Sequence, residues 1–278
     1  MGIKIMDNGL EQSLKRYYDR LYARNAGTNW VERLLNFELG EQVPLILEPG
    51  LDYPLLRSRY LSSLIPVGSE RIAVLDVGAG NGWASLKLAL GDFRVFAIDF
   101  SVHAVKTVSF HRDHFLPLDS RSNLSLLQGT VHKLPFADST FDLVLCLALL
   151  QNYQNTMTIL GEIHRTCKIG GIAIIETYNR NSLWYPWARR LQRIQGIAYN
   201  EFVSMSEFRR ILRRQFEIET ALCYYFAPPG IWRLPNHLQK VLNSIFVVLD
   251  PCFQRIPLLG RWGRMLIAKC RRVGSAES

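Results

Sequence analysis

At 278 residues, the chain is long enough for a single α/β domain with a sizeable core, and no linker rich in Ser, Gly or Pro divides it. Its longest apolar runs, such as LVLCLALL and SIFVVL, are far shorter than the ~18–20 residues that cross a bilayer, which argues against an integral membrane protein. The formal net charge is +9, but Lys and Arg number 17 against 18 Asp and Glu in residues 1–176, and 16 against 6 in residues 177–278. The basic excess in the C-terminal part indicates either a solvated surface or a docking face for phosphates.

The cysteines and the N-terminal residues bear on the compartment. Five cysteines are widely spread and form no C-x-x-C pair, which favours neither a zinc site nor a disulfide framework. The stretch MGIKIMDNGLEQSLKRYYD lacks the apolar core of a secretory signal. We therefore expect no bound metal and a cytoplasmic protein, in peripheral contact with a membrane at most. Most of the thiols are expected to act as small buried hydrophobes.

The first part of the chain has helical spacing. Residues 1–66 include LEQSLKRYYDRLYARN and WVERLLNFEL, which precede any candidate strand. We predict that residues 1–66 form an N-terminal helical lid over the domain that follows.

Alternating strands and helices begin at Arg71. Segments with helical spacing, such as WASLKLAL and MTILGEIHRTC, separate the earlier strands. This order predicts an α/β, Rossmann-like fold with a seven-stranded, mostly parallel sheet and helices on both faces. The last strand follows a long insertion, so it could enter the sheet antiparallel. The seven predicted strands are IAVLDVG, FRVFAIDF, LSLLQGT, FDLVLCLALL, GGIAIIETY, FEIETALCYY and RMLIAKCRR.

The insertion before the last strand spans residues 227–263 and begins at the breaker APPG. Apolar residues recur there at steps of three and four, which predicts an amphipathic helix that ends at Asp250 and Pro251. We assign residues 67–278, including this helical insertion, to one domain. The apolar positions are Leu238, Val241, Leu242, Ile245, Phe246, Val248 and Leu249.

A glycine-rich turn follows the first predicted strand, in the stretch IAVLDVGAGNGWASLKLA. Gly78 and Gly80 lie where the chain must turn tightly and let a ligand approach the backbone, which a Cβ would obstruct. The helix that follows offers free N–H groups and the positive end of its dipole. The dinucleotide fingerprint G-x-G-x-x-G fits poorly, because Trp83 occupies the position of its third glycine. The pattern is instead D-x-G-x-G-x-G, from Asp76 to Gly82.

Asp99 ends the next predicted strand, nineteen residues beyond Gly80. An acidic side chain at this position can accept hydrogen bonds from both hydroxyl groups of a ribose. Its alternative role is to cap the helix that begins near Ser101. The glycine turn and Asp99 together indicate a ligand of the nucleotide type.

Several segments, in register, resemble those of the class I S-adenosylmethionine-dependent methyltransferases, in particular the group that modifies small molecules and lipids. VLDVGAGNG is similar to the first motif of that family, and FAIDFSVHAV is similar to its second strand. The approach to the family's fourth strand resembles LPFADSTFDLVL, and the approach to its fifth strand resembles GEIHRTCKIGGIAIIE. A later helix and strand of the family resemble SMSEFRRILRRQFEIE. The resemblance covers residues 73–219 and implies a methyltransferase that uses S-adenosyl-L-methionine.

The resemblance also implies which residues bind the cofactor. The glycine turn would cradle the methionine part, with Asp76 near its amino group and the backbone of Cys146 close by. Asp99 would bind the ribose, Phe100 would pack against the adenine face, and residues 130–131 would flank the adenine edge. The implied cofactor-binding set is Asp76, Gly78, Ala79, Gly80, Asp99, Phe100, Thr130, Val131 and Cys146.

Two positions depart from the family pattern. Thr130 stands where an acidic residue commonly accepts a bond from the adenine amino group, and a hydroxyl group makes a weaker contact than a carboxylate. Gln151 and Asn152 stand after the fourth strand, where many relatives have histidines, and neither amide is a general base. Methyl transfer from a sulfonium needs a positioned, desolvated nucleophile rather than an obligatory catalytic side chain, so the catalytic residue is left unassigned.

Other side chains are candidates for closing or lining the acceptor site. Tyr17 or Tyr18 lies in RYYD, which resembles an N-terminal lid, and could close over the cofactor or pack within a helix. Glu176 and Tyr178 follow at the end of the fifth predicted strand. The nearby aromatic residues could line an acceptor pocket, or belong to the core or a lid; they are Trp184, Tyr185 and Trp187.

We therefore predict an enzyme that methylates a small-molecule or lipid-like acceptor, in a pocket roofed by the N-terminal helices and the insertion. A nucleic-acid methyltransferase is an alternative, although the arginine pairs of residues 189–214 recur at helical spacing, as on a solvated face. A catalytically inactive cofactor-binding subunit is a third hypothesis, because of Thr130 and the amides at residues 151–152. The apolar, basic-flanked insertion could also rest on an anionic bilayer.

Overall fold

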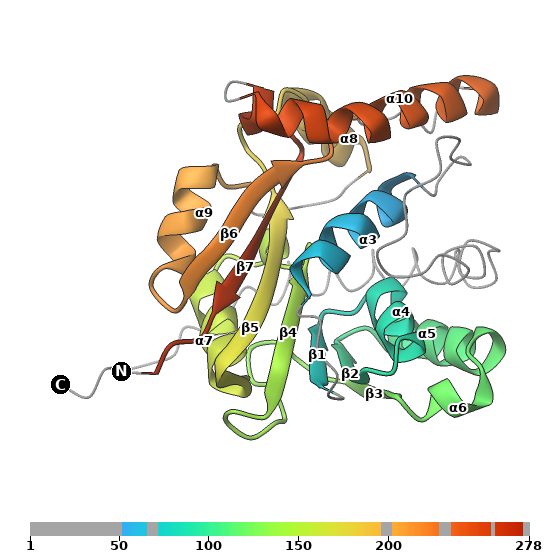
Figure 1. Cartoon of the computed structure of the whole chain (residues 1–278), viewed down its shortest axis with the longest axis vertical. Helices are drawn as coiled ribbons and strands as arrows, with labels where there is room; N and C mark the ends of the chain where they lie inside the picture. Colours follow the sequence, from blue (N-terminus) through green and yellow to red (C-terminus); the bar gives the residue numbers. More distant parts are fainter. Residues whose placement is uncertain (1–51, 66–71, 196–201, 228–234, 257–258, 275–278) are drawn as a thin grey trace.

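The computed structural model describes residues 52–65, 72–195, 202–227, 235–256 and 259–274 (Figure 1). Its seven strands form one sheet in the order β3-β2-β1-β4-β5-β7-β6. The strands are β1 (Ala73–Val77), β2 (Arg94–Asp99), β3 (Leu124–Gln128), β4 (Phe141–Leu147), β5 (Cys167–Tyr178), β6 (Glu217–Tyr224) and β7 (Met265–Arg271).

The strand directions confirm the predicted, mostly parallel sheet. Neighbouring pairs from β3 to β5 run parallel, and β7 runs antiparallel to both β5 and β6, as expected for the last strand. The strand order reverses between β1 and β4, because the chain moves outward from β1 to β3 and then returns beside β1. The connections at such a switch point leave in opposite directions, which opens a crevice at the carboxyl ends of the strands.

Helices cover both faces of the sheet. Helices α3 (Asp52–Leu64), α4 (Trp83–Leu90) and α5 (Val102–Phe115) contribute to one buried apolar cluster, and α7 (Thr156–Thr166) and α9 (Met205–Leu212) contribute to the other. Val74 faces the first cluster and Leu75 the second, as the alternation of a pleated strand requires. None of the described helices is long and apolar enough to cross a bilayer. The remaining elements are α6 (Leu118–Arg121), α8 (Tyr185–Gln195), α10 (Asn236–Arg255) and the 3-10 turns η1 (Leu150–Asn152) and η3 (Leu259–Arg261).

The predicted end of the insertion helix at Asp250 and Pro251 is wrong, because α10 continues through Pro251 to Arg255. Tertiary contacts outweigh the proline's lost backbone donor. The Asp250 carboxylate accepts hydrogen bonds from the backbone N–H of Tyr225 (2.8 Å), and Gln254 Nε2 donates to it from the turn beyond the proline (3.0 Å). Of the predicted lid, residues 1–51, with Tyr17 and Tyr18, lie outside the described residues.

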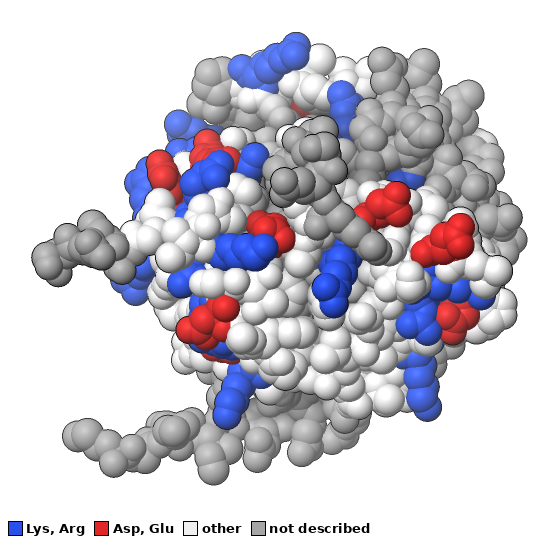
Figure 2. Space-filling view, turned by 60° about the horizontal axis from the view of Figure 1, so that its bottom comes forward, with Lys and Arg blue, Asp and Glu red and all other residues white. Residues whose placement is uncertain are grey.

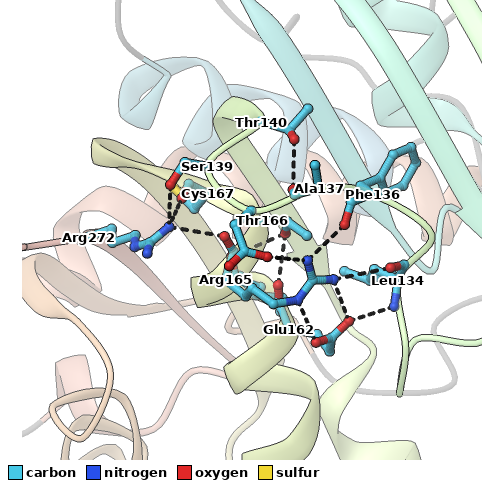
Figure 3. A network of polar contacts seen from close by, with 12 residues as sticks. Leu134, Phe136, Ala137, Ser139, Thr140, Glu162, Arg165, Thr166, Cys167 and Arg272 are labelled. Carbon is cyan, nitrogen blue, oxygen red and sulfur yellow. Dashed lines mark hydrogen bonds and ion pairs between the residues drawn. The ribbon is translucent and has the colours of Figure 1, made fainter.

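Arg165, near the end of α7, holds the segment that leads into β4 (Figure 3). Its guanidinium group donates to the carbonyl oxygens of Leu134 (3.1 Å) and Phe136 (2.7 Å) and to the carboxylate of Glu162 (2.8 Å). The hydrogen bonds from Arg165 and from the Leu134 N–H lower the pKa of the Glu162 carboxyl group. Two segments that resemble methyltransferase motifs, LPFADSTFDLVL and GEIHRTCKIGGIAIIE, are therefore tied together at the start of β4.

The cysteines follow the prediction that most of them act as small hydrophobes. Cys146, Cys167, Cys223 and Cys270 are buried, and Cys252 on α10 is exposed. Burial raises the pKa of the thiols of Cys167, Cys223 and Cys270 to about 12. These buried thiols are therefore protonated at neutral pH and are packing groups rather than nucleophiles.

Candidate active site

The turn after β1 depends on its glycines. Gly78, Gly80 and Gly82 have φ angles of +74°, +59° and +77°, in the left-handed region that side chains with a Cβ rarely adopt. A Cβ on Gly78 would also lie 2.6 Å from Leu149 Cδ1. The N–H groups of Gly78 and Ala79 donate to the carbonyl oxygen of Ile98 (2.8 and 3.1 Å), which fixes the turn against the end of β2.

Asp99 joins this turn to the start of α5. Its Oδ2 accepts a hydrogen bond from the Gly80 N–H (2.9 Å), and its Oδ1 accepts one from the Ser101 N–H (2.9 Å). The side-chain cap of α5 is the Ser101 hydroxyl, which accepts from the Ala104 N–H (3.3 Å). Capping is thus done mainly by Ser101, and the buried Asp99 carboxylate lies at the carboxyl end of β2, beside the glycine turn.

The loop after β3 reaches the same edge. The Gly129 N–H donates to the Asp99 carbonyl oxygen (2.9 Å), and Gln128 Nε2 donates to the Phe100 carbonyl oxygen (3.3 Å). Thr130 is exposed, and Val131 is buried in the core cluster on the α7 side of the sheet. Gln128 and Gly129 thus join this loop to Asp99 and Phe100, and Thr130 and Val131 follow directly in the chain.

Asp76 is a second buried carboxyl group at this edge of the sheet. The Ser85 hydroxyl donates to its Oδ2 (2.5 Å), a contact that the sequence analysis did not anticipate. Burial raises the pKa of Asp76 to about 6, and the charge of Asp99 adds to this, against the Ser85 hydrogen bond and the Arg57 guanidinium group. Cys146, on the neighbouring β4, is fully buried, and burial together with the charge of Asp76 raises the pKa of its thiol.

Glu176, at the carboxyl end of β5, is held by a buried ion pair. Arg57 of α3 donates from Nε to Glu176 Oε1 (3.0 Å) and from Nη2 to Oε2. The Tyr224 hydroxyl of β6 also donates to Oε1. The Arg57 guanidinium group lies 5.0 Å from the centre of the Trp83 ring, at the first residue of α4. Arg57 therefore connects the acceptor side of the edge to the helix that follows the glycine turn.

A second polar cluster, behind this ion pair, joins α3 to α10. The Tyr60 hydroxyl donates to Asp250 Oδ2 (2.6 Å), and the Tyr60 and Tyr224 rings lie 4.6 Å apart. Asp250 is fully buried, and burial raises the pKa of both its carboxyl group and the Tyr60 hydroxyl. The sequence analysis missed Arg57, Tyr60 and Tyr224. The one signal in the sequence was Asp250, an acidic residue at the end of the apolar run SIFVVLD, and its position was interpreted only as the end of the insertion helix.

Amides occupy the segment after β4, as the sequence indicates. Gln151 and Asn152 are buried in η1. Thr177 Oγ1 donates to Gln151 Oε1 (3.4 Å), and Gln151 Nε2 donates to the Ala148 carbonyl oxygen. Within the part of the chain that the structure describes, no group of three or more His, Cys, Asp or Glu side chains could hold a metal ion.

The aromatic residues after β5 divide into packed and exposed ones. Tyr178 stacks on Phe202 with ring centroids 4.9 Å apart, and Tyr185 meets the same ring at 5.3 Å. Trp184 Nε1 donates to the Phe226 carbonyl oxygen (2.8 Å). Trp187 is exposed. Packing thus accounts for Tyr178, Trp184 and Tyr185, while Trp187 lies at the surface.

Comparisons with known proteins bear on the methyltransferase interpretation. Residues 75–175 match a family model described as a methyltransferase domain. The chain is 30% identical over 193 residues to the ubiquinone biosynthesis O-methyltransferase of Rickettsia prowazekii, an alignment that covers 63% of this chain and 74% of that enzyme. The chain belongs to the class I S-adenosylmethionine-dependent methyltransferases. A demethylmenaquinone methyltransferase of Streptomyces avermitilis is 34% identical over 114 residues, or 41% of this chain and 45% of that enzyme.

Solved structures share the fold of this methyltransferase. A geranyl diphosphate C-methyltransferase from Streptomyces coelicolor A3(2) superposes with a TM-score of 0.61 at 12% identity, over 96% of this chain and 99% of that one. A possible histamine N-methyltransferase from Thermotoga maritima gives a TM-score of 0.59 at 15% identity, over 92% and 98%. Across six ubiquinone biosynthesis O-methyltransferases of Rickettsia species, the chain spans 42% to 76% of each enzyme's length. The protein is an S-adenosyl-L-methionine-dependent methyltransferase.

Proposed function

We propose that this methyltransferase acts on a small-molecule, lipid-like acceptor such as a quinone precursor. The observation that carries the proposal is the alignment with a ubiquinone biosynthesis O-methyltransferase over 63% of this chain. The shorter alignment with a demethylmenaquinone methyltransferase supports the same acceptor class.

We infer that Asp76 binds the ammonium group of the cofactor's amino-acid part and that Asp99 binds the ribose of its nucleoside part. S-adenosyl-L-methionine carries a cationic ammonium group, and a buried carboxyl group whose pKa is raised to about 6 gains strongly from a nearby cation. Asp99 ends β2, the position from which a carboxylate accepts hydrogen bonds from the ribose hydroxyl groups. The residues of the glycine turn fit the methionine part, because Gly78 and Gly80 present backbone without a Cβ.

The other assignments follow the resemblance. Ala79 would complete the backbone cradle, and the Cys146 backbone would lie beside the methionine part. Phe100 would pack against the adenine ring, while Thr130 and Val131 would flank its edge. Support for this grouping comes from the hydrogen bonds that join the loop after β3 to Asp99 and Phe100.

The bound cofactor would supply an electrophilic methyl group with its leaving group already attached. Among the described residues that follow β4 and end β5, Gln151 and Asn152 are amides, and the Glu176 carboxylate is engaged by Arg57 and Tyr224. We infer that the acceptor is a phenol or an acidic carbon, whose proton passes to water without a strong protein base. The chain's part would then be to orient and desolvate the nucleophile.

We also propose the division of the chain into a lid, residues 1–66, and a catalytic domain, residues 67–278 with its insertion. The described part of that lid is α3, whose Arg57 and Tyr60 contact β5 and α10. These two contacts support the view that α3 and the insertion together roof the acceptor side.

Methyl-labelled S-adenosyl-L-methionine tests the acceptor class directly. The full chain is incubated with three acceptor pools: prenylated catechols and naphthoquinols, the same head groups without a tail, and tRNA or rRNA fragments. We expect label in the prenylated phenols and a higher KM for the tail-less analogues. Label in RNA alone, or only in polar acceptors, would overturn the proposal while leaving the enzyme class untouched.

A further inference from the structure

Helix α10 exposes a row of large apolar side chains, which is the reverse of an ordinary surface helix. Its side chains are between 37% and 56% exposed, although each is a large hydrophobe. They recur at steps of three, four, three and one, so they form one stripe along a helix about 30 Å long. We call this stripe the α10 face; it consists of Leu238, Val241, Ile245, Val248 and Leu249.

The opposite side of α10 is the one that contacts the domain. Asp250 is fully buried there and accepts hydrogen bonds from Tyr60 and from the backbone of Tyr225 and Phe226. The Phe253 ring packs against Phe226 with centroids 5.2 Å apart. The orientation of α10 is therefore fixed by specific polar contacts, and the α10 face is left toward solvent.

Exposed apolar side chains continue beyond the helix. Ile256 follows the C-terminus of α10, and Trp262 follows η3; both are at least 40% exposed. The Leu183 N–H donates to the Trp262 carbonyl oxygen (3.2 Å), which brings the segment before α8 to the same place. Leu183 and Trp187 are also exposed, at 60% and 57%. Exposed apolar groups of this number indicate an interaction surface rather than scattered surface residues.

The described side chains of α8, α10 and η3 carry exposed charges of one sign. Within the described side chains of α8, α10 and η3, the only acidic residue is Asp250, and it is buried. The opposite end of the molecule differs, because there Lys and Arg alternate with Asp and Glu (Figure 2) and form pairs such as Lys168 with Asp142. The basic residues of the α10 end are Arg189, Arg190, Arg255, Arg261 and Arg264.

The α10 face lies at the end of the sheet that carries the active site. Tyr178 and Tyr224, the last residues of β5 and β6, both pair with Met265, so these strands end at the same edge. Helix α10 crosses this edge and contacts α3, which lies below it in the view of Figure 1. A ligand that leaves an apolar phase at the α10 face would therefore start close to Glu176 and Arg57.

We propose that the α10 face docks on the surface of an anionic lipid bilayer. The stripe inserts its apolar side chains at the level of the acyl chain boundary, and the five arginines contact the phosphates of the head groups. This inference goes beyond the proposed acceptor and does not require it.

A second copy of the chain is the other candidate to cover the α10 face. Symmetric pairing would bring the same surface of both copies together, and with it the five arginines of each copy. Such like-charge contact is unfavourable, whereas anionic head groups complement it. The charge pattern therefore favours a bilayer over a dimer.

Co-sedimentation of the full chain with lipid vesicles tests the proposal. We expect binding to vesicles of phosphatidylcholine mixed with phosphatidylglycerol, weaker binding to phosphatidylcholine alone, and weakening with added salt. The double variant Ile245→Glu with Val248→Glu should lower the partition coefficient by about tenfold or more, because two inserted side chains become charged. The matched control is Leu118→Glu on α6, which alters a residue that is 76% exposed and should bind like the unmodified chain.

Three outcomes would overturn the proposal: no binding of the unmodified chain to either vesicle, equal loss of binding in the control, or a dimer in sedimentation velocity that the double variant converts to monomer. Circular dichroism shows whether each variant is folded. Methyl transfer to a tail-less phenol, measured without vesicles, separates the two proposals, since it depends on the acceptor site and not on the α10 face.

Discussion

The two halves of the active-site edge are built in different ways. At the ends of β1, β2 and β3, the hydrogen bonds that hold the glycine turn are made within residues 76–131, largely by backbone groups such as the Gly80 and Gly129 N–H, and Arg57 reaches this half only through the Trp83 ring and its charge on Asp76. At the ends of β5 and β6, side chains far apart in the sequence meet: Arg57 and Glu176 are 119 positions apart, and Tyr60 and Asp250 are 190 apart.

This difference in construction suggests that substitutions in the two halves will affect different quantities, namely cofactor affinity in one half and the free energy of unfolding in the other. The half that we assign to the cofactor is a local strand-turn-helix unit, so altering it should change cofactor affinity more than folding. The half that we assign to the acceptor exists only when α3 and α10 are docked on the sheet, so altering it should first change the free energy of unfolding. Each of the following predictions tests this division.

The largest effect on the free energy of unfolding is expected for Glu176→Gln. This change leaves the Arg57 guanidinium group buried without its carboxylate, which destabilises proteins by about 3–5 kcal/mol. Urea unfolding followed by circular dichroism measures the loss. Glu219→Gln is the control, because Glu219 pairs with Arg271 and Lys269 at a half-exposed position and should cost less than about 1 kcal/mol. Equal losses of unfolding free energy in Glu176→Gln and Glu219→Gln would show that the buried ion pair contributes no more than an exposed one.

Asp99→Ala should act mainly on cofactor affinity. Two hydrogen bonds from ribose hydroxyl groups to a carboxylate are lost, at about 1.5–3 kcal/mol each, so the dissociation constant should rise about a hundredfold or more. Isothermal titration calorimetry measures it. Ser101→Ala, which removes only the cap of α5, should reduce stability by about 1 kcal/mol and leave the affinity nearly unchanged. Unaltered affinity in Asp99→Ala would mean that the ribose binds elsewhere.

Tyr60→Phe should destabilise the protein with little change in cofactor affinity. The variant loses the hydrogen bond to the buried Asp250 while keeping its ring beside Tyr224, a loss of about 1–3 kcal/mol in the free energy of unfolding. Tyr185→Phe keeps its ring against Phe202 and serves as the control. A large drop in cofactor affinity in Tyr60→Phe would show that the two halves are coupled and would contradict the prediction.

Asp76 should give cofactor binding a pH dependence below about pH 6. Burial raises its pKa to about 6, against the Arg57 charge and the Ser85 hydrogen bond and together with the Asp99 charge. A bound ammonium group requires the ionised form, so affinity should be constant above pH 6 and fall by up to about tenfold per pH unit below it. Titrations between pH 5 and pH 8 measure this slope, which Asp76→Asn should flatten.

The Asp76 carboxyl group should affect the stability of the cofactor-free protein in the opposite direction, so that stability falls as the pH rises. Because the pKa of Asp76 is raised in the folded state, its ionisation weakens the cofactor-free protein as the pH rises from about 4 to about 6. Stability that instead increased through this window in the unmodified chain, and not in Asp76→Asn, would show that the carboxyl group has a depressed pKa.

The sequence predicted the parts of the fold that local patterns encode. All seven apolar runs are strands, and the D-x-G-x-G-x-G pattern indicated a turn whose three glycines have positive φ. Asp99 was found because it ends a strand at a set distance from the turn. Arg57, Tyr60 and Tyr224 could not be found in this way, because nothing within their own segments distinguishes them from ordinary surface or core residues.

Helix α10 shows a further limit of sequence patterns. The steps of three and four correctly predicted an amphipathic helix, but periodicity does not tell which face contacts the domain. The buried Asp250 decides the orientation here, since its partners lie in α3 and at the end of β6. The same contacts carry the helix past Pro251, which the local pattern marked as an end.

Cys252 gives the methyltransferase a native reporter of its own surroundings. It follows Val248 by four residues, so it lies on the same side of the helix as the α10 face, and it is the exposed one of the five thiols. The other four are buried, so a maleimide fluorophore should label Cys252 selectively in the unmodified sequence. Emission from that fluorophore would change with the polarity around α10, so the state of this helix could be followed during turnover without any engineered substitution.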